Sequence, residues 1–350
     1  MSTITPFAAG SFNSRETARM FVEMRKSAET LERQMATGKR SDTYSGLGFE
    51  RRASLDLRAR LSAYESYGDT ITSADLRLKV MMSSVEGLEK IASKTRSAAM
   101  EPLSGIVDAT GTPQEAALAR NNLAFAVEIL NSDVNGRYVF AGRASDTRPM
   151  EAYQEIFTDL RAAVAAIVPD PTDPDAIITA VTNYFDGANW RPAGSESTPA
   201  LGTPAAETAD ARASVTARVD EGQSVAIGAR VDEPGFRNLL ISLGALAAAD
   251  ETQMTQEDYA ALSARVADLL SPSHPQPRDI AMDLGRAQAS IAAVKERQEA
   301  SSSLLREALD DVELVSTEEA AVSLLNLQTR LQASFQTTAI LSRLSLVNYL

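Results

Sequence analysis

Few side chains in this sequence could carry out chemistry. The only histidine, His274, stands between Ser273 and Pro275, and the chain contains no cysteine. A cysteine nucleophile, a thiolate metal site and a site built from several histidines are therefore excluded. Neither a phosphate-binding loop, nor a dinucleotide fingerprint, nor a Gly-x-Ser-x-Gly elbow occurs. The adjacent carboxylates Asp310–Asp311 and Glu318–Glu319 lie in segments with helical periodicity, where we expect them to be solvated. We therefore expect no enzyme, no cofactor and no metal site.

One aromatic residue leaves a binding function open. Trp190 is the only tryptophan, and it follows Tyr184 and Phe185. Its ring could stack on a sugar, which would make the middle of the chain a glycan- or ligand-binding module. The other interpretation is that these three aromatic side chains form the small core of that module. A screen of the isolated module against glycans would separate the two.

The apolar residues near the start of the chain have helical spacing. From Thr17 onward they follow one another at alternating steps of three and four residues, which places them on one face of a helix. They are Phe21, Met24, Ala28, Leu31 and Met35. Gly38 is expected to end this helix. A second helical face runs from Leu57 to about Ala99.

The other end of the chain repeats this pattern with one change of register. One apolar face runs from Ala287 to Val315, and the next starts one residue out of step at Ala320. Ser316 and Glu319 have the spacing of a capping box, so we expect a joint between two helices there. The last ten residues, LSRLSLVNYL, are largely apolar, and we expect a partner surface to cover them because uncovered termini are usually polar and frayed. Large apolar residues between Ala320 and the end of the chain include Leu324, Leu327, Leu331, Phe335, Leu341, Leu344 and Leu350.

The middle of the chain differs in composition. Residues 143–285 contain 10 Lys and Arg against 22 Asp and Glu, which accounts for almost all of the net charge of −13. Alternating apolar residues on both sides of Asp220–Gly222 predict a β-hairpin over 213–231, and short helices are expected on both sides of it. Without a basic patch we expect no nucleic-acid partner. Without a run of about 20 apolar residues we expect no membrane insertion.

Together these elements predict a mainly α fold with a smaller α+β part. Both termini would build a long antiparallel helical bundle or coiled coil, into which a domain of helices and a β-hairpin is inserted. We expect three parts. They are a terminal assembly region (1–40 with 316–350), a helical core domain (41–149 with 280–315, including a short strand at 137–141) and an acidic outer domain (150–279).

The segment LNSDVNGRYVFAGRASDTRPM (130–150) resembles a signature of the flagellin superfamily, and of its hook-filament junction proteins (hook-associated protein 3) in particular. The pattern combines a helix end, an Asn-Gly turn and an aromatic strand, in which Tyr138 and Phe140 are expected on one side. Its positions are Asn131, Gly136, Tyr138, Phe140, Gly142, Thr147 and Pro149. LERQMATGKR (31–40) and the ending from Val312 onward are similar to the terminal helices of that family. The chain departs from the family at SGLGFE (45–50), where many members have an acidic Asp-Asp-Pro stretch.

The resemblance implies a structural subunit of the bacterial flagellum that lies outside the cell. Such a subunit is exported through the flagellar channel with an export chaperone and without a cleaved signal peptide. The opening MSTITPFAAGSFNSRET fits this expectation, because it has neither a basic nor an apolar signal region. The subunit would self-assemble into a ring or tube and join the hook to the filament, with flagellin and another hook-associated protein as partners.

The resemblance also implies which residues make the contacts between subunits. The terminal helices would bury Phe21, Met24, Leu31 and Met35 at one end of the chain. At the other end they would bury Leu324, Leu327, Leu331, Phe335, Leu341, Leu344 and Leu350. Filament flagellin, which shares the scaffold, is the alternative. A filament subunit would be present in far more copies per flagellum than a junction subunit.

Overall fold

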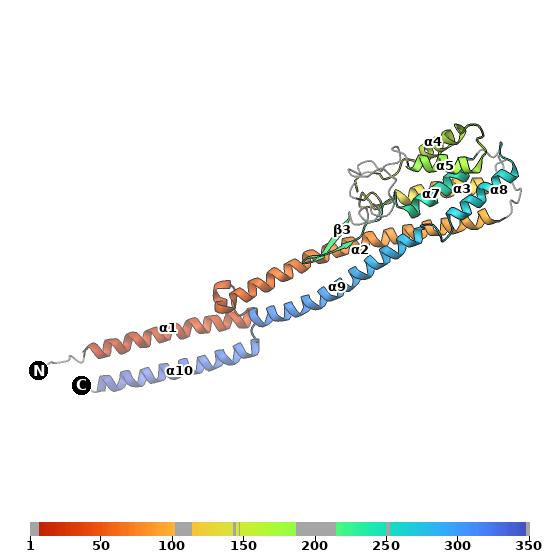
Figure 1. Cartoon of the computed structure of the whole chain (residues 1–350). Coiled ribbons are helices and arrows are strands. Elements are labelled where there is room, and N and C mark those ends of the chain that lie inside the picture. Colours follow the sequence, from red (N-terminus) through yellow and green to blue (C-terminus); the bar gives the residue numbers. More distant parts are fainter. Residues whose placement is uncertain are drawn as a thin grey trace. The chain divides into compact units, whose positions relative to one another are not determined.

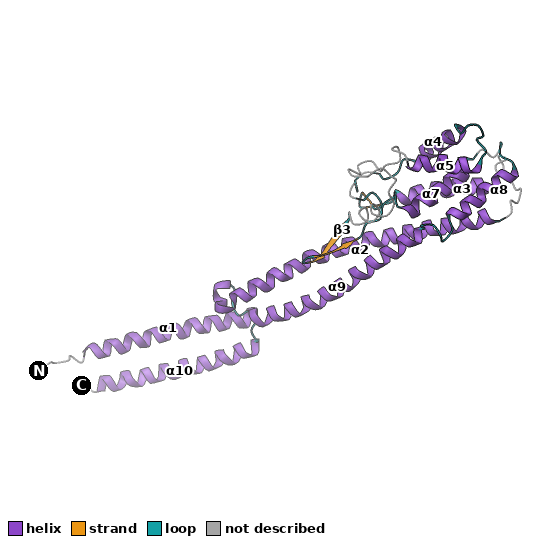
Figure 2. Cartoon of the chain, in the orientation of Figure 1, coloured by secondary structure: helices purple, strands orange, loops and turns teal. Residues whose placement is uncertain are grey.

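The structure, a computed structural model, describes residues 7–101, 114–142, 145–146, 148–186, 215–249 and 253–347. The side chains of 7–15, 17, 114, 186 and 341–347 are outside this description. Most of the described residues are helical, and their strands form two short hairpins (Figure 2). The predicted fold class, mainly α with a smaller α+β part, is confirmed. The chain divides into two compact units, Met1–Glu65 with Glu299–Leu350, and Ser66–Gln298.

The first unit is built from both ends of the chain. Its long helices α1 (Phe7–Thr37) and α10 (Thr317–Val347) pack side by side (Figure 1). The two helices are antiparallel, because Phe21 stacks on Phe335 while the end of α1 meets the start of α10, where the amide of Val315 donates to the carbonyl of Gly38. The short 3-10 helix η1 (Tyr44–Glu50), the beginning of α2 (Arg51–Met100) and the end of α9 (Pro277–Glu313) complete the unit.

The predicted joint between the last two helices is confirmed. α9 ends at Glu313 and α10 begins at Thr317. The Ser316 hydroxyl accepts a hydrogen bond from the Glu319 amide at 3.3 Å, as a capping residue does. It donates to the side chain of Glu318 rather than to that of Glu319. α1 begins at Phe7, ahead of Thr17, from which the helical spacing of the apolar residues was followed.

The second unit is organised around α7 (Pro234–Ala248), which packs against four other helices. They are α3 (Gln114–Leu130), α4 (Tyr153–Ala165), α5 (Pro174–Asp186) and α8 (Gln256–Leu269). α7 is buried from Gly235 to Ala248 on almost every face, which its nearly continuous apolar sequence allows. Gly244 permits the close approach, since a Cβ atom there would lie 3.1 Å from the side chains of Leu160 and Val181.

The first hairpin, β1 (Asp133–Val134) with β2 (Arg137–Tyr138), corrects the predicted strand at 137–141. The strand stops at Tyr138, and Val139 and Phe140 are both buried beyond it. Tyr138 and Phe140 therefore do not share one side of a single strand as predicted. The physical reason is a change of partner, because the Phe140 carbonyl accepts from the Val231 amide at 3.1 Å instead of extending the hairpin.

The second hairpin is where the alternating pattern predicted it. β3 (Thr216–Asp220) pairs with β4 (Gln223–Ala226) in antiparallel register, with Ala217 opposite Val225 and an irregularity between Arg218 and Asp220. Its inward side chains are buried. The hairpin is attached to α9, because the buried amide of Gln298 donates to the Val219 carbonyl and Arg297 pairs with Asp220 at 2.9 Å.

Candidate assembly surface

The apolar faces of the two terminal helices meet each other within one chain. Phe21, Met24 and Leu31 on α1 are half-buried, as are Leu324, Leu327 and Leu331 on α10. The rings of Phe21 and Phe335 stack with their centroids 4.7 Å apart and their planes at 11°. The predicted stripes therefore form an intramolecular seam. Burial in a two-helix pair is partial, because the described side chains of each helix pack mainly against the other helix and many of them stay exposed.

Large apolar side chains of both helices also remain exposed. Met35 is 39% exposed and Phe335 59%, even though its ring stacks on Phe21. A further set, absent from the predicted residues, is exposed to a similar degree. It comprises Met20, Val22, Val322, Leu325 and Ile340, with exposed fractions from 47% to 63%. Full burial of such a side chain stabilises a protein by about 1.5–3 kcal/mol, so an assembly that covers these side chains is stabilised by their burial.

The structure does not describe the side chains of three predicted contact residues. Leu341 and Leu344 belong to α10, but their side chains are not described, and Leu350 lies outside the described residues. Their assignment to contacts between subunits stays a prediction, as does that of the residues in the seam.

The joint between the terminal helices is held by one carboxylate that the sequence did not single out. Glu313 accepts from the Ser54 hydroxyl at 2.6 Å and from both Nε (2.7 Å) and a terminal nitrogen of Arg58, while its carbonyl accepts from the Arg40 amide at 2.7 Å. The hydrogen bonds from Arg58 lower the pKa of Glu313, and burial opposes them. One acidic residue thus joins the end of α9 to the start of α2 through its side chain, and to the segment after α1 through its carbonyl.

The residues of the 131–149 motif have structural roles in the second unit. Asn131 accepts from the Met150 amide at 2.9 Å. Asn135 and Gly136 both have positive φ, as a tight hairpin turn requires. The Phe140 ring is fully buried and meets Phe236 edge-to-face at 5.5 Å.

The last positions of the motif continue the same framework. Gly142 has a φ of 63°, and a Cβ atom there would lie 3.3 Å from the side chain of Arg230. Arg230 itself forms a nearly buried ion pair with Asp232. Pro149 is buried, and Thr147 lies outside the described residues. The motif therefore shapes the core of this unit.

The aromatic residues considered for glycan binding are partly in that core. Phe185 is fully buried and Tyr184 half-buried, with the two rings edge-to-face at 5.1 Å. Burial raises the pKa of Tyr184, and the carboxylates of Glu151, Asp159 and Glu155 raise it further, so the phenol stays neutral. Trp190 lies outside the described residues. The position of Tyr184 and Phe185 fits the core interpretation.

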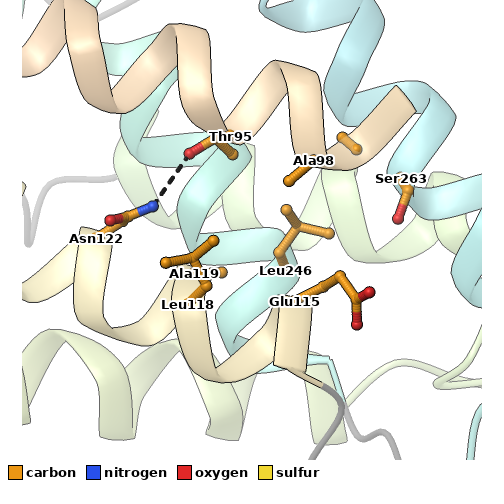
Figure 3. A pocket seen from close by; sticks show the side chains of 9 residues that line it. Thr95, Ala98, Glu115, Leu118, Ala119, Asn122, Leu246 and Ser263 are labelled. Atoms are coloured by element: carbon orange, nitrogen blue, oxygen red, sulfur yellow. Dashed lines mark hydrogen bonds between the residues drawn. The ribbon is translucent and has the colours of Figure 1, made fainter. Parts of the chain in front are cut away.

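A small pocket lies between α2, α3, α7 and α8 (Figure 3). Its walls are mostly apolar, and Asn122 donates to the Thr95 hydroxyl across it at 3.4 Å. Its volume of about 10 Å³ matches the space that one water molecule needs. His274 is 40% exposed at its side chain and lies 3.9 Å from Asp268. Among the described residues, no group of three His, Cys, Asp or Glu side chains could hold a metal ion.

None of the described helices combines the length and apolar character that a membrane span requires.

Comparisons with known proteins do not establish a family. No protein-family model matches the sequence, and no curated protein does. Among solved structures, the chain is similar to one from Vibrio parahaemolyticus that is provisionally named a flagellar hook-associated protein. The alignment covers 78% of this chain and 99% of that one, with 9% identity and a TM-score of 0.47. A likeness at this level does not show a shared family.

Proposed function

We propose that this chain is a structural subunit of the bacterial flagellum that joins hook to filament by self-assembly through its terminal helices. The observation that carries the proposal is the α1–α10 pair. It exposes large apolar side chains such as Leu325 and Ile340 outside its own seam, and a monomer gains nothing from such exposure. The flagellar assignment is supported by the 131–149 motif and both chain ends, which resemble those of the flagellin superfamily.

The proposed mechanism is burial of the exposed apolar surface between copies. A helix pair with one covered seam can add further helices around it, as coiled-coil bundles do. If each copy uses one surface to contact a different surface of the next, the contacts do not close on a dimer, and a ring or helical tube results. The residues predicted at the subunit contacts would then be buried partly by the α1–α10 seam of their own chain and partly by neighbouring copies.

The three predicted parts of the chain become roles in this proposal. Residues 1–40 with 316–350 would form the assembly region, 41–149 with 280–315 a helical core domain, and 150–279 an outer domain. The excess of negative charge in the last part would keep the surface of the assembly soluble and limit lateral association. Export without a cleaved signal peptide, an export chaperone, and flagellin and another hook-associated protein as partners belong to the same proposal.

Electron microscopy of the purified full chain, alone and mixed with flagellin, tests the proposal. We expect rings or short tubes that grow with protein concentration, and attachment of flagellin to them. Limited proteolysis gives a second test, because α1 and α10 should be cut faster in the monomer than in the assembly. A chain that stays monomeric at all concentrations, or terminal helices as protected in the monomer as α7, would contradict it.

Filament flagellin remains the alternative within the same class. The exposed surface of α1 and α10 would serve a long filament as well as a short junction. Counting the copies per flagellum by quantitative mass spectrometry separates the two, because a filament subunit would greatly outnumber the hook subunits and a junction subunit would not.

A further inference from the structure

The most exposed apolar side chain in the described part of the chain is Phe49, on η1. Its relative exposure is 105%, so the ring has no cover from its own chain. The surrounding backbone fixes this position. Leu47, two residues earlier, is buried and anchors the turn, and Gly48 between them has a φ of 58° and a ψ of −120°, a conformation that residues other than glycine rarely adopt. Glu50, on the other side, pairs with Arg40.

Two arginines follow this residue closely in the sequence. Arg51 and Arg52 begin α2 directly after η1, and both are exposed. The carboxylates of the neighbouring sequence have cations of their own, since Asp42 lies 3.8 Å from Arg33 and Asp56 3.1 Å from Arg60. Among the described residues neither Arg51 nor Arg52 has a carboxylate within ion-pair distance. Leu55, one turn further along α2, is 48% exposed. We call the surface formed by Phe49, Arg51, Arg52 and Leu55 the Phe49 knob.

The same unit carries a surface of complementary chemistry at the start of α10. Glu318, Val322 and Leu325 follow one another at steps of four and three residues, so they share one face of the helix. This face points away from the seam, because Val322 is 58% and Leu325 63% exposed while Leu324 and Leu327 are half-buried. Glu319 is exposed beside them. Among the described residues no cation is paired with either carboxylate. Glu318, Glu319, Val322 and Leu325 are called the α10 patch below.

We propose that the Phe49 knob of one copy docks on the α10 patch of a second copy. Phe49 and Leu55 would cover Val322 and Leu325, while Arg51 and Arg52 would face Glu318 and Glu319. The argument for a second copy is this match of an aromatic, cationic surface with an apolar, anionic one on the same chain. Exposed aromatic rings and arginines are also the residue types that dominate the energetics of protein interfaces.

This contact rests on the proposed self-assembly and adds a direction to it. When the copy that receives a knob docks its own knob on a third copy, the contact is heterologous, and a docked pair still has one free knob and one free patch for further copies. An array rather than a closed dimer follows.

Photo-cross-linking of the full chain tests where the ring of residue 49 lies. Phe49 is replaced by benzoylphenylalanine, which keeps an aromatic ring in place, and the assembled protein is irradiated. We expect a product of twice the chain mass whose link maps to residues 318–325 in the tryptic peptide 307–330. Leu304, which is 67% exposed on α9, carries the same group in a matched control. A link from position 49 to another part of the second copy, or a yield no higher than that from position 304, overturns the contact.

Charge exchange tests the electrostatic half. Arg52→Glu and Glu319→Arg should each raise the concentration at which half of the chain is assembled by about tenfold. The double variant should assemble at a concentration close to that of the wild type. Phe49→Ala should also raise this concentration by about tenfold. Leu304→Ala and Arg306→Glu, at exposed positions on α9, should change it by less than about threefold.

The results separate the contact from the proposed function. If the wild-type chain never assembles, both are wrong. If the wild type assembles, but the half-assembly concentration of the double variant rises by as much as the effects of the two single variants combined, the knob contact is wrong and the proposed function stands. Circular dichroism of each variant shows whether a loss comes from unfolded helix, which would leave the cross-link as the deciding result.

Discussion

Glu313 shows how much of the terminal unit depends on one side chain. Glu313→Gln keeps the size of the side chain but removes its charge, so the hydrogen bonds from Arg58 lose their ionic component. Hydrogen bonds to charged groups contribute about 1.5–3 kcal/mol, and since Arg58 is half-exposed we expect a loss of about 1–2 kcal/mol in the free energy of unfolding. Urea denaturation followed by circular dichroism measures it, and an unchanged midpoint would contradict it.

The same residue predicts a dependence on pH. The pKa of Glu313 lies below its ordinary value of 4.5 in the folded chain. Its contribution to stability is therefore complete above pH 4.5 and is lost as the pH falls through the folded pKa. We expect the Tm of the wild type to fall more steeply than that of Glu313→Gln below about pH 4.5. Parallel curves for the two proteins would show that Glu313 does not contribute in this way.

Two glycines in helices should respond oppositely to the same substitution. A Cβ atom on Gly235, in α7, would lie 2.6 Å from the backbone carbonyl oxygen of Gln276, so Gly235→Ala should lower the free energy of unfolding by about 1–3 kcal/mol. Gly285, in α9, faces open space, and Gly285→Ala should raise it by about 0.5–1 kcal/mol through helix propensity. Chemical denaturation measures both, and effects of the same sign would contradict the packing argument.

At the scale of elements, the β3–β4 hairpin depends on α9 for the cover of its backbone. Gln298 is 6% exposed and donates to the Val219 carbonyl. Gln298→Met fills a similar volume but leaves that carbonyl without a donor, which costs about 1–3 kcal/mol. Gln288→Met, at a half-buried position on the same helix, should stay within about 0.5 kcal/mol. Hydrogen exchange of the hairpin amides should increase in the first variant only, and equal exchange in both would refute the attachment.

At the scale of the whole molecule, the exposed apolar residues of α10 should govern association and not folding. Leu325→Glu places a charge on a position that is 63% exposed, so the helical content of the monomer should not change. If Leu325 is covered by a second copy, the concentration needed for half-assembly should rise by about tenfold or more. Sedimentation velocity over a concentration series measures this shift. Leu304→Glu is the matched control, and an equal shift there would point to a general effect of charge.

The helices and the second hairpin could be predicted because their signals are local. Each signal depends only on residues that are close in the sequence. The signals are the steps of three and four residues in α1 and α10, the register change before Ser316 and the alternation around Gly222. The first hairpin was only half predicted, because the end of β2 depends on Val231, which lies far along the sequence. On α2 Met81 is fully buried while its neighbour Met82 is half-buried, because packing against other helices selects between adjacent residues.

The sequence alone determined that the chain is mainly helical, that both its ends carry an apolar stripe, and that a joint separates the last two helices. Only the tertiary structure decided that these stripes face each other within one chain, that Val322 and Leu325 lie outside their seam, and that Phe49 has no cover. The physical reason is that spacing along the sequence fixes which residues share a face of a helix. What that face meets depends on groups hundreds of residues away, such as Glu313 for Ser54 and Arg58.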